Sequence, residues 1–468
     1  MKRPSRRLFT ELLVVSLAAL VWSCAPVPPA RVAKEKPVPI SELSLEQKIA
    51  QMFMVRYSGN YVHESSYAYQ QAKRLVQRYG IGGIILFYGS IPGTIENLND
   101  LQSLSRIPLM VAADYERGVG QQLDGGTLFP TNMALAATGQ PELANSQGMV
   151  TAREASSLGV HVVLAPVMDV NSNPDNPIIN FRSFGDSPEV VSRFGVEFIK
   201  GIQQNGLFAT AKHFPGHGDA SADSHTLPPV ISASRAEIEE TDLAPFKAAI
   251  DAGVKVIMVG HLVVPSLDAS SLPASVSPEL NGRLLRNVMG DEGFFMNDAM
   301  EIGGITKSFW AGEAAIRAIE AGSDIVLLSM DVERAMDAVA WAVRSGRLPE
   351  KRVDESVRRI MTAKRKLGLW ENRAASLSKA RSLVGSRDFR SVASEIARKS
   401  ITLVKDEAGL IPIPVGSAES LTHILLSTDE GLMSMSEPFR SAVSRIHGNV
   451  RTKFIYEPLT DLSIQELV

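Results

Sequence analysis

Residues 211–226 hold a dense group of titratable side chains. They read AKHFPGHGDASADSHT and contain three of the chain's eight histidines. The segment begins at the end of an apolar run, Leu207–Ala211, that is typical of a buried strand, and it continues into the Pro, Gly, Ala and Ser residues of a loop. A buried strand that ends in a loop of titratable groups is typical of an active site at the edge of a sheet.

Asp223 and His225 in this segment could form an acid/base pair. They are separated by one residue, so their side chains can hydrogen-bond to each other in an irregular loop. A carboxylate bound to one imidazole nitrogen fixes the tautomer and raises the basicity of the other nitrogen, which gives a general acid/base that works near neutral pH. Asp298, which ends another apolar run, could then act as a nucleophile or as an electrostatic stabiliser.

Two other interpretations of the segment stay open. One is a metal site of the hydrolytic zinc kind, whose ligands would come from His213, His217, Asp219, Asp223 and His225. Against it, no cysteine takes part, and Phe214 and Pro215 suit packing better than ligation. The other is that His213 and His217 only satisfy backbone groups of the loop.

Eight short apolar runs alternate with segments of helical periodicity from Ser41 onward. We predict strands at 51–57, 81–87, 108–114, 160–166, 207–214, 254–261, 293–299 and 323–330. Helical spacing lies between them, for example at 142–158, 189–204, 235–252 and 312–321. Eight strands that alternate with helices over about 300 residues predict a (β/α)8 barrel. A doubly wound open sheet is the structural alternative, but no glycine-rich phosphate-binding fingerprint follows the first strand.

A (β/α)8 barrel carries its catalytic residues at the carboxyl ends of its strands. Titratable side chains stand at or just after the ends of five predicted strands: Asp114, Asp169, Lys212 with His213, His261, and Asp298. Random placement would scatter such groups equally along helices and loops. The pattern therefore indicates one catalytic face.

Composition and charge are those of a soluble globular protein. The chain has 468 residues, of which 21% are charged and 45% apolar, and its net charge is −3. No basic run occurs outside the first seven residues, so neither nucleic acid nor an anionic membrane surface is expected as a partner. The length suggests two or three domains.

The first 24 residues have the pattern of an export signal. Four basic residues within the first seven precede an apolar run at 8–22, and the chain's only cysteine, Cys24, follows before a Pro-rich segment. This arrangement resembles a bacterial lipoprotein signal, in which the cysteine is lipidated. A plain secretory signal or an uncleaved anchor is the alternative. We expect a signal over 1–24, a linker over 25–40, and an exported protein of the periplasm or outer membrane that attaches to the membrane through lipidated Cys24.

Five motifs together resemble glycoside hydrolase family 3, in particular its β-N-acetylglucosaminidases. They are RSFG at 182–185, KHFPGHGD at 212–219, DSH at 223–225, NDAM at 297–300 and DESVRRIMTAKRKLGL at 354–369. They occur in family order over roughly 41–370. The resemblance implies a catalytic barrel over 41–372, a connector over 373–392 and, over 393–468, the start of a small or truncated α/β sandwich domain. Within this last part, short apolar runs predict strands at 401–404 and 424–427.

The resemblance also implies a reaction. The chain would be a retaining exo-glycosidase that removes terminal β-linked N-acetylglucosamine, with peptidoglycan fragments as the expected substrate of an exported enzyme. Asp298 would be the nucleophile, His225 the acid/base and Asp223 the residue that orients it. The terminal sugar would be bound by Asp114, Arg182, Lys212 and His213. The carbohydrate is the expected partner, and neither a cofactor nor a metal is expected.

Near the third strand, the chain departs from the family pattern. The motif DYERG has Arg117 in place of a glycine, and Gln122 stands where an arginine is expected. This departure makes a catalytically inactive sugar-binding lipoprotein conceivable, although Asp298, Asp223 and His225 are intact. Within the family, the alternatives are a β-glucosidase or β-xylosidase, and a phosphorylase that carries the same residues. The DSH triplet favours the N-acetylglucosaminidase, because glucosidase-type members usually take their acid/base carboxylate from a second domain.

Overall fold

The computed structural model describes residues 37–222, 227–286, 293–414, 421–426 and 432–455. It divides into two compact units, Met1–Ile401 and Thr402–Val468. Each unit is described by itself. The segment expected to be an export signal and Cys24 lie outside the described residues, as do Asp223 and His225.

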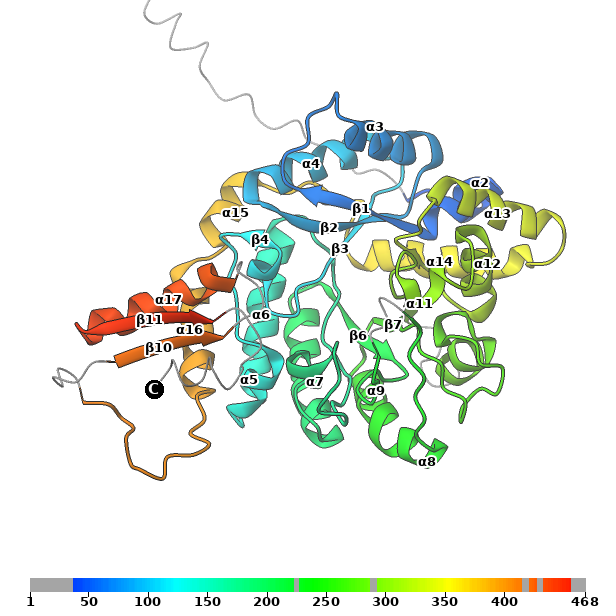
Figure 1. The fold of residues 1–468 in the computed structure, drawn as a ribbon. Coiled ribbons are helices and arrows are strands. Elements are labelled where there is room, and N and C mark those ends of the chain that lie inside the picture. Colours follow the sequence, from blue (N-terminus) through cyan, green and yellow to red (C-terminus); the bar gives the residue numbers. More distant parts are fainter. Residues whose placement is uncertain (1–36, 223–226, 287–292, 415–420, 427–431, 456–468) are drawn as a thin grey trace, which may run out of the picture. The chain divides into compact units, whose positions relative to one another are not determined.

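The first unit is built around a parallel sheet that closes into a barrel (Figure 1). Its strands follow the order β8-β7-β6-β5-β3-β2-β1-β9, and the short β4 (Leu123–Asp124) pairs with β2. The eight barrel strands are β1 (Phe53–Gly59), β2 (Gly83–Ser90), β3 (Met110–Ala113), β5 (Val162–Val163), β6 (Phe208–Phe214), β7 (Val256–Val259), β8 (Phe294–Asn297) and β9 (Val326–Leu327). Each lies within or overlaps one predicted strand, and the predicted (β/α)8 barrel is confirmed.

The barrel closes between β8 and β9 with less backbone pairing than its other joints. A single parallel bridge, Met296 to Ile325, joins them. The N–H of Ile325 donates to the carbonyl oxygen of Phe295 at 3.1 Å, and the N–H of Asp324 donates to the same oxygen at 2.8 Å. The Asp324 carboxylate in return accepts the N–H of Phe295 at 3.1 Å. A side chain thus contributes to closing the ring.

Helices surround the strands (Figure 1). They are α2 (Leu45–Gln51), α3 (Tyr67–Arg74), α4 (Ile91–Leu104), α5 (Asn132–Ala137), α6 (Glu142–Ser157), α7 (Pro188–Gln203), α8 (Arg235–Glu237), α9 (Leu243–Asp251), α11 (Gly303–Thr306), α12 (Ala311–Ala321), α13 (Val332–Arg344) and α14 (Glu350–Lys366). The four predicted helical segments correspond to α6, α7, the run from α8 to α9, and α12. Local signals fix their starts: at α7, Ser187 caps the helix and Pro188 fills its first position.

Two hydrophobic clusters follow from the alternation of side chains along the strands. On β3, Val111 and Ala113 belong to the cluster that includes α6 and α7, whereas Met110 and Ala112 belong to the other cluster. All seven residues of β6 are buried, as expected for a parallel strand covered on both faces. The barrel is therefore a rigid scaffold for the residues at its strand ends.

Two further helices belong to the first unit. These are α15 (Leu377–Leu383) and α16 (Arg387–Lys399), and both pack on α6. Phe389, Ala393 and Ile396 of α16 are buried in the core. The sequence assigns 373–392 to a connector and starts the C-terminal domain at 393, whereas the first unit extends to Ile401. The regularly spaced apolar residues of α16 therefore pack in the core of the first unit.

The second unit contains a β-α-β segment. It comprises β10 (Leu421–Leu426), α17 (Leu432–Ile446) and β11 (Val450–Ile455), with Leu421 opposite Val450 in a parallel pair. The strand predicted at 424–427 overlaps β10. The strand predicted at 401–404 is wrong, because no strand of the described chain pairs with these residues, and Ile401 and Val404 are 82% and 90% exposed.

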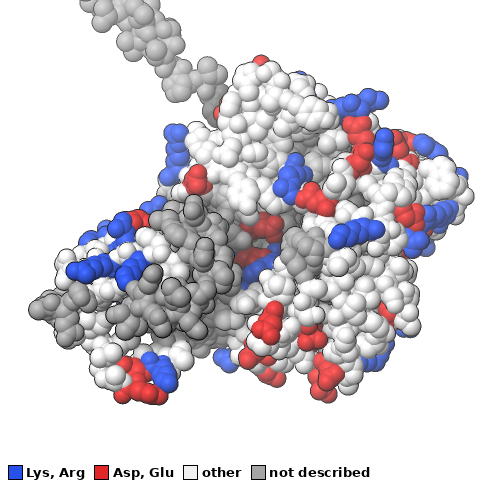
Figure 2. Space-filling model, viewed as in Figure 1, with Lys and Arg blue, Asp and Glu red and all other residues white. Residues whose placement is uncertain are grey.

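Charges of both signs are interspersed over the face shown in Figure 2. Among the described helices, none combines the length and the apolar character that crossing a membrane requires.

Candidate active site

The ends of the barrel strands meet around a cavity of about 470 Å³. Five of the predicted site residues line it: Asp114, Arg182, Lys212, His213 and Asp298. Its apolar walls include Ile85, Leu164 and Met258, which belong to the same hydrophobic cluster as Met110 and Ala112 of β3. On the face shown in Figure 2, acidic and basic side chains gather in a hollow.

Glu116 connects two of the predicted sugar-binding cations. Arg182 donates to its two carboxylate oxygens, from Nη2 at 2.8 Å and from Nε at 3.1 Å. Lys212, at the end of β6, places Nζ 2.8 Å from Glu116 and 2.8 Å from Asp114. Burial alone would raise the pKa of Glu116, but Arg182 and Lys212 lower it well below its usual range. Glu116 is therefore ionised beside its two cations, and charged groups make strong, directional hydrogen bonds to hydroxyls.

Asp169 fixes the segment that follows β6. Its buried carboxylate accepts the backbone N–H of His213 at 3.2 Å and that of His217 at 2.8 Å. It also lies 2.8 Å from Nδ1 of His213. Burial would raise the pKa of Asp169, but the two histidines lower it below its usual value. Because Nδ1 of His213 is held in this way, Nε2 is the ring nitrogen left for a ligand.

Asp298 follows β8 and is a carboxylate held in its ionised form. Its Oδ1 accepts the N–H of Ala299 at 2.7 Å. Burial alone would raise the pKa of Asp298, but His213, His261, the Ala299 N–H and Lys212 together lower it to about 2. A charged carboxylate that faces the sugar is what the first step of a double displacement requires.

The loop that leads toward Asp223 and His225 is held by close backbone packing at its start. A Cβ on Gly218 would lie 1.5 Å from the carbonyl oxygen of Val170, so a larger residue does not fit there. Asn176 donates from Nδ2 to the carbonyl oxygens of His217 and Gly218, at 2.8 and 3.0 Å. The loop therefore leaves the barrel in a defined direction.

The metal alternative names His213 and His217 as two of its ligands. The centroids of their rings lie 6.1 Å apart. Within the described ranges, no group of three or more His, Cys, Asp or Glu side chains is arranged to hold a metal ion. Asp223 and His225, which that alternative also needs, lie outside those ranges.

Glu116 was not among the predicted site residues, and Asp169 was predicted only as a strand-end residue. Glu116 is two residues after Asp114 in the motif DYERG, so its proximity to the site could have been inferred. The cavity wall also contains Arg56, paired with Glu301, and both residues that depart from the family pattern, Arg117 and Gln122.

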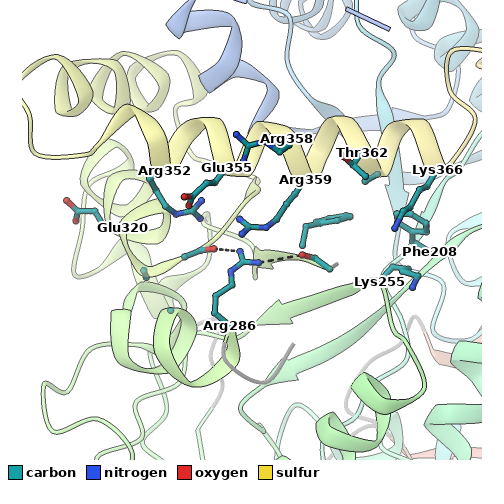
Figure 3. A pocket seen from close by; sticks show the side chains of 16 residues that line it. Phe208, Lys255, Arg286, Glu320, Arg352, Glu355, Arg358, Arg359, Thr362 and Lys366 are labelled. Atoms are coloured by element: carbon teal, nitrogen blue, oxygen red, sulfur yellow. Dashed lines mark hydrogen bonds between the residues drawn. The ribbon is translucent and has the colours of Figure 1, made fainter. Parts of the chain in front are cut away.

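A larger cavity, of about 890 Å³, lies at the opposite end of the barrel (Figure 3). It is lined by Phe208 and Phe294, which begin β6 and β8. Figure 3 shows Arg352 and Arg359 on α14, across the cavity from Arg286. These three arginines bind the buried Asp324, the nearest contact being 2.6 Å from Arg286. Residues at the amino-terminal ends of barrel strands usually serve stability, so this cavity is the weaker candidate for catalysis despite its size.

The chain is similar to proteins of one glycosidase family over most of its length. Residues 44–363 match the family model described as "Glycosyl hydrolase family 3 N terminal domain". A "Beta-N-acetylglucosaminidase/beta-glucosidase" of Cellulomonas fimi is 33% identical over 383 residues, which are 80% of this chain and 67% of that protein. Among solved structures, a family 3 β-N-acetylglucosaminidase from Paenibacillus sp. str. FPU-7 has a TM-score of 0.80 at 32% identity and covers 91% of this chain and 82% of its own. A β-glucoside phosphorylase has a TM-score of 0.81 at 28% identity, with 91% of this chain and 78% of its own chain covered.

Proposed function

The chain belongs to glycoside hydrolase family 3, as its motifs predict, and from this premise we propose that it is a retaining β-N-acetylglucosaminidase. The observation that carries the proposal is the ionised Asp298 in one cavity with the charged cluster of Asp114, Glu116, Arg182 and Lys212. Preference for an N-acetylated sugar is supported by the name of the Paenibacillus relative and by the triplet at 223–225, whereas the name of the Cellulomonas relative includes both activities.

The proposed reaction has two displacements. In the first, an Asp298 oxygen bonds to the anomeric carbon, the bond to the leaving oxygen breaks, and His225 gives that oxygen a proton. In the second, His225 takes a proton from water, the water oxygen bonds to the anomeric carbon, and the bond to Asp298 breaks. Asp223 orients His225. Two inversions at one carbon give net retention.

The deciding experiment compares aryl β-N-acetylglucosaminide with aryl β-glucoside. We expect kcat/KM to be at least about tenfold higher for the N-acetylated substrate, and a preference for the glucoside would contradict the proposal. The His225→Ala variant should lose less activity on substrates with acidic leaving groups, because these groups leave without protonation. An equal loss on every substrate would remove His225 from the acid/base role.

A phosphorylase is the second candidate, favoured by the similarity to the β-glucoside phosphorylase. In that reaction, phosphate would replace water in the second displacement. Adding inorganic phosphate and measuring sugar 1-phosphate separates the two candidates. If sugar 1-phosphate is the main product, the enzyme is a phosphorylase.

The proposed setting is the cell envelope, with peptidoglycan fragments as substrates and Cys24 as the lipidated anchor. The support is the pattern of residues 1–39 in the sequence. The Cys24→Ala variant should move from the membrane fraction to the soluble envelope fraction. An unchanged membrane fraction would contradict lipid anchoring.

A further inference from the structure

Asn176 is a buried amide whose hydrogen-bonding groups are all in use. It is 1% exposed and lies in the chain between β5 and α7. Its Nδ2 donates to the carbonyl oxygens of His217 and Gly218, at 2.8 and 3.0 Å. Its Oδ1 accepts the backbone N–H groups of Ile178 and Ile179, at 2.9 and 2.8 Å. An amide side chain has two N–H donors and two lone pairs on its oxygen, so its capacity is filled by two different segments of the chain.

The donor side of Asn176 fixes the segment after β6, which leads in sequence toward the proposed acid/base pair. His225 comes seven residues after Gly218. Asn173 contacts the same segment: its backbone N–H donates to the carbonyl oxygen of Gly218 at 3.3 Å, and its Nδ2 donates to that of Ala220 at 3.2 Å. Two asparagines therefore hold three carbonyl groups of this segment.

The acceptor side of Asn176 supports Arg182. Ile178 and Ile179, whose N–H groups bind Asn176, offer their own carbonyl oxygens to this arginine. Nη1 of Arg182 donates to Ile178 at 3.3 Å, and the backbone N–H of Arg182 donates to Ile179 at 2.7 Å. The Arg182 guanidinium in turn makes two hydrogen bonds to Glu116 in the active-site cavity. One buried amide thus connects a predicted sugar-binding residue with the segment after β6.

This connection differs from the one that Asp169 makes. Asp169 accepts the backbone N–H groups of His213 and His217 and so ties the segment after β6 to the barrel. Asn176 binds the carbonyl groups of the segment and ties it to the residues that support Arg182. An acid/base acts only within hydrogen-bond reach of the leaving oxygen, so its effect depends on where its loop stands relative to the bound sugar.

We propose that Asn176 is a positioning residue, which aligns the segment leading to His225 with the sugar that Arg182 binds. The inference rests on the proposed function and deepens it, because it gives the acid/base a defined place relative to the substrate. Asn176 itself does not line the cavity. It acts through Arg182 and through the carbonyl groups of the segment after β6.

The variant Asn176→Asp separates the two sides of this connection. A carboxylate of nearly the same shape still accepts from Ile178 and Ile179, but it has no N–H to donate to His217 and Gly218. The probes are two aryl β-N-acetylglucosaminides: the 3,4-dinitrophenyl group leaves without protonation, whereas the phenyl group needs it. We expect kcat/KM to fall by about 30-fold or more on the phenyl substrate and by less than about threefold on the dinitrophenyl substrate.

Binding of the sugar itself should respond to the other side of Asn176. The product N-acetylglucosamine, used as a competitive inhibitor, measures it. Its inhibition constant should stay within about twofold in Asn176→Asp, which keeps the acceptor, and rise by about fivefold or more in Asn176→Ala, which removes the support of Arg182. An unchanged constant in Asn176→Ala would overturn the connection to Arg182.

The matched control is Asn97→Asp. Asn97 is also a buried amide, and its Nδ2 donates to the carbonyl oxygens of Ser58 and Asn60, at 3.0 and 2.6 Å. None of these three residues lines the cavity. The control loses the same kind of hydrogen bonds, so it should lower Tm to a similar extent and keep the phenyl-to-dinitrophenyl ratio of the unmodified enzyme.

A double variant tests whether Asn176 acts through His225. When Asn176→Asp is added to His225→Ala, we expect no further change in the phenyl-to-dinitrophenyl ratio, because the residue that is positioned is already gone. A further fall in this ratio would overturn the inference. So would a fall in Asn176→Asp alone that is equal on both substrates, because that result describes a purely structural role, or the absence of any fall.

If Asn176→Asp does not fold, the milder variant Asn173→Ala decides, since it removes only the contact with Ala220 and the side chain is partly exposed. We expect kcat/KM to fall by about threefold to tenfold on the phenyl substrate alone, and an equal result on both substrates would contradict the inference. If the unmodified enzyme hydrolyses neither N-acetylglucosaminide, the proposed function fails and the inference fails with it.

Discussion

Asp298 is kept ionised by four neighbouring groups. Its ionised state determines how the loss of this carboxylate should affect catalysis. With a pKa lowered to about 2, it is a carboxylate throughout the pH range of ordinary assays. We expect Asp298→Gly to lower kcat by about a thousandfold or more, because the first displacement loses its nucleophile. Added azide should restore turnover and give the α-glycosyl azide, since it attacks from the face that Asp298 occupied. Asp337→Asn, at an exposed position on α13, is the control.

Asp242 should make stability depend on pH. Burial and the charges of Asp169 and Asp219 raise its pKa to about 7, and its Oδ1 has no hydrogen-bond partner among the residues that the structure describes. The folded chain therefore binds a proton that the unfolded chain has released between about pH 4 and pH 7, so stability falls as pH rises through this window. The largest effect is about 4 kcal/mol. Denaturant unfolding of Asp242→Asn at pH 5 and pH 8 should show a smaller difference than the unmodified protein, and an equal difference would contradict the prediction.

Site residues could be predicted where their position depends only on strand order. Asp114, Lys212 and Asp298 stand at or directly after strands, so the barrel brings them together once its strands are counted. The place of Glu116 near the site follows from Asp114, two residues before it, but its pairing with Lys212 and Arg182 could not be predicted, because these residues come from segments distant in sequence. Such a contact depends on side-chain packing, which the periodicity of apolar residues along the sequence does not reveal.

At the scale of elements, α14 stabilises the joint between β8 and β9 through Asp324. This carboxylate is fully buried, accepts from Ser356 on α14 at 2.7 Å, and binds three arginines. Asp324→Ala should lower the free energy of unfolding by about 3–5 kcal/mol, because it removes the buried carboxylate that three partly buried arginines share. Urea unfolding measures the loss, and Asp337→Ala is the control. A loss below about 1 kcal/mol would mean that the joint does not depend on the carboxylate.

The elements that could be predicted are those with a strong local signal. The wholly buried β6 and the amphipathic α6 and α7 were predicted close to their observed bounds. The residues of α16 were predicted to lie in the connector and the C-terminal domain and not in the barrel unit. Phe389, Ala393 and Ile396 are nevertheless spaced by four and three residues, as on one face of a helix. Periodicity showed that this segment has an apolar face but could not show that α6 covers it.

At the scale of the whole molecule, the two compact units predict how the chain tolerates shortening. All described cavity residues lie before Ile401. A chain that ends at Ile401 should keep kcat/KM on the aryl β-N-acetylglucosaminide within about twofold. A chain that ends at Asn372 should be less stable by about 3–6 kcal/mol, because it removes the buried Phe389 and Ile396 side chains. Thermal unfolding and the aryl assay measure both, and equal stability of the two shortened chains would contradict the assignment of α15 and α16 to the barrel.

The closing of the ring also sets an order of events during synthesis. In the finished barrel, β1 pairs with β9, Phe53 opposite Val326, and roughly 270 residues of chain separate the two strands. At 5–20 residues per second, the ribosome needs roughly 15 to 55 seconds to make that interval. Until β9 and α14 emerge, β1 presents an unpaired edge, which is a template for aggregation. For most of its translation, the nascent chain is therefore expected to expose a strand edge that the finished barrel covers.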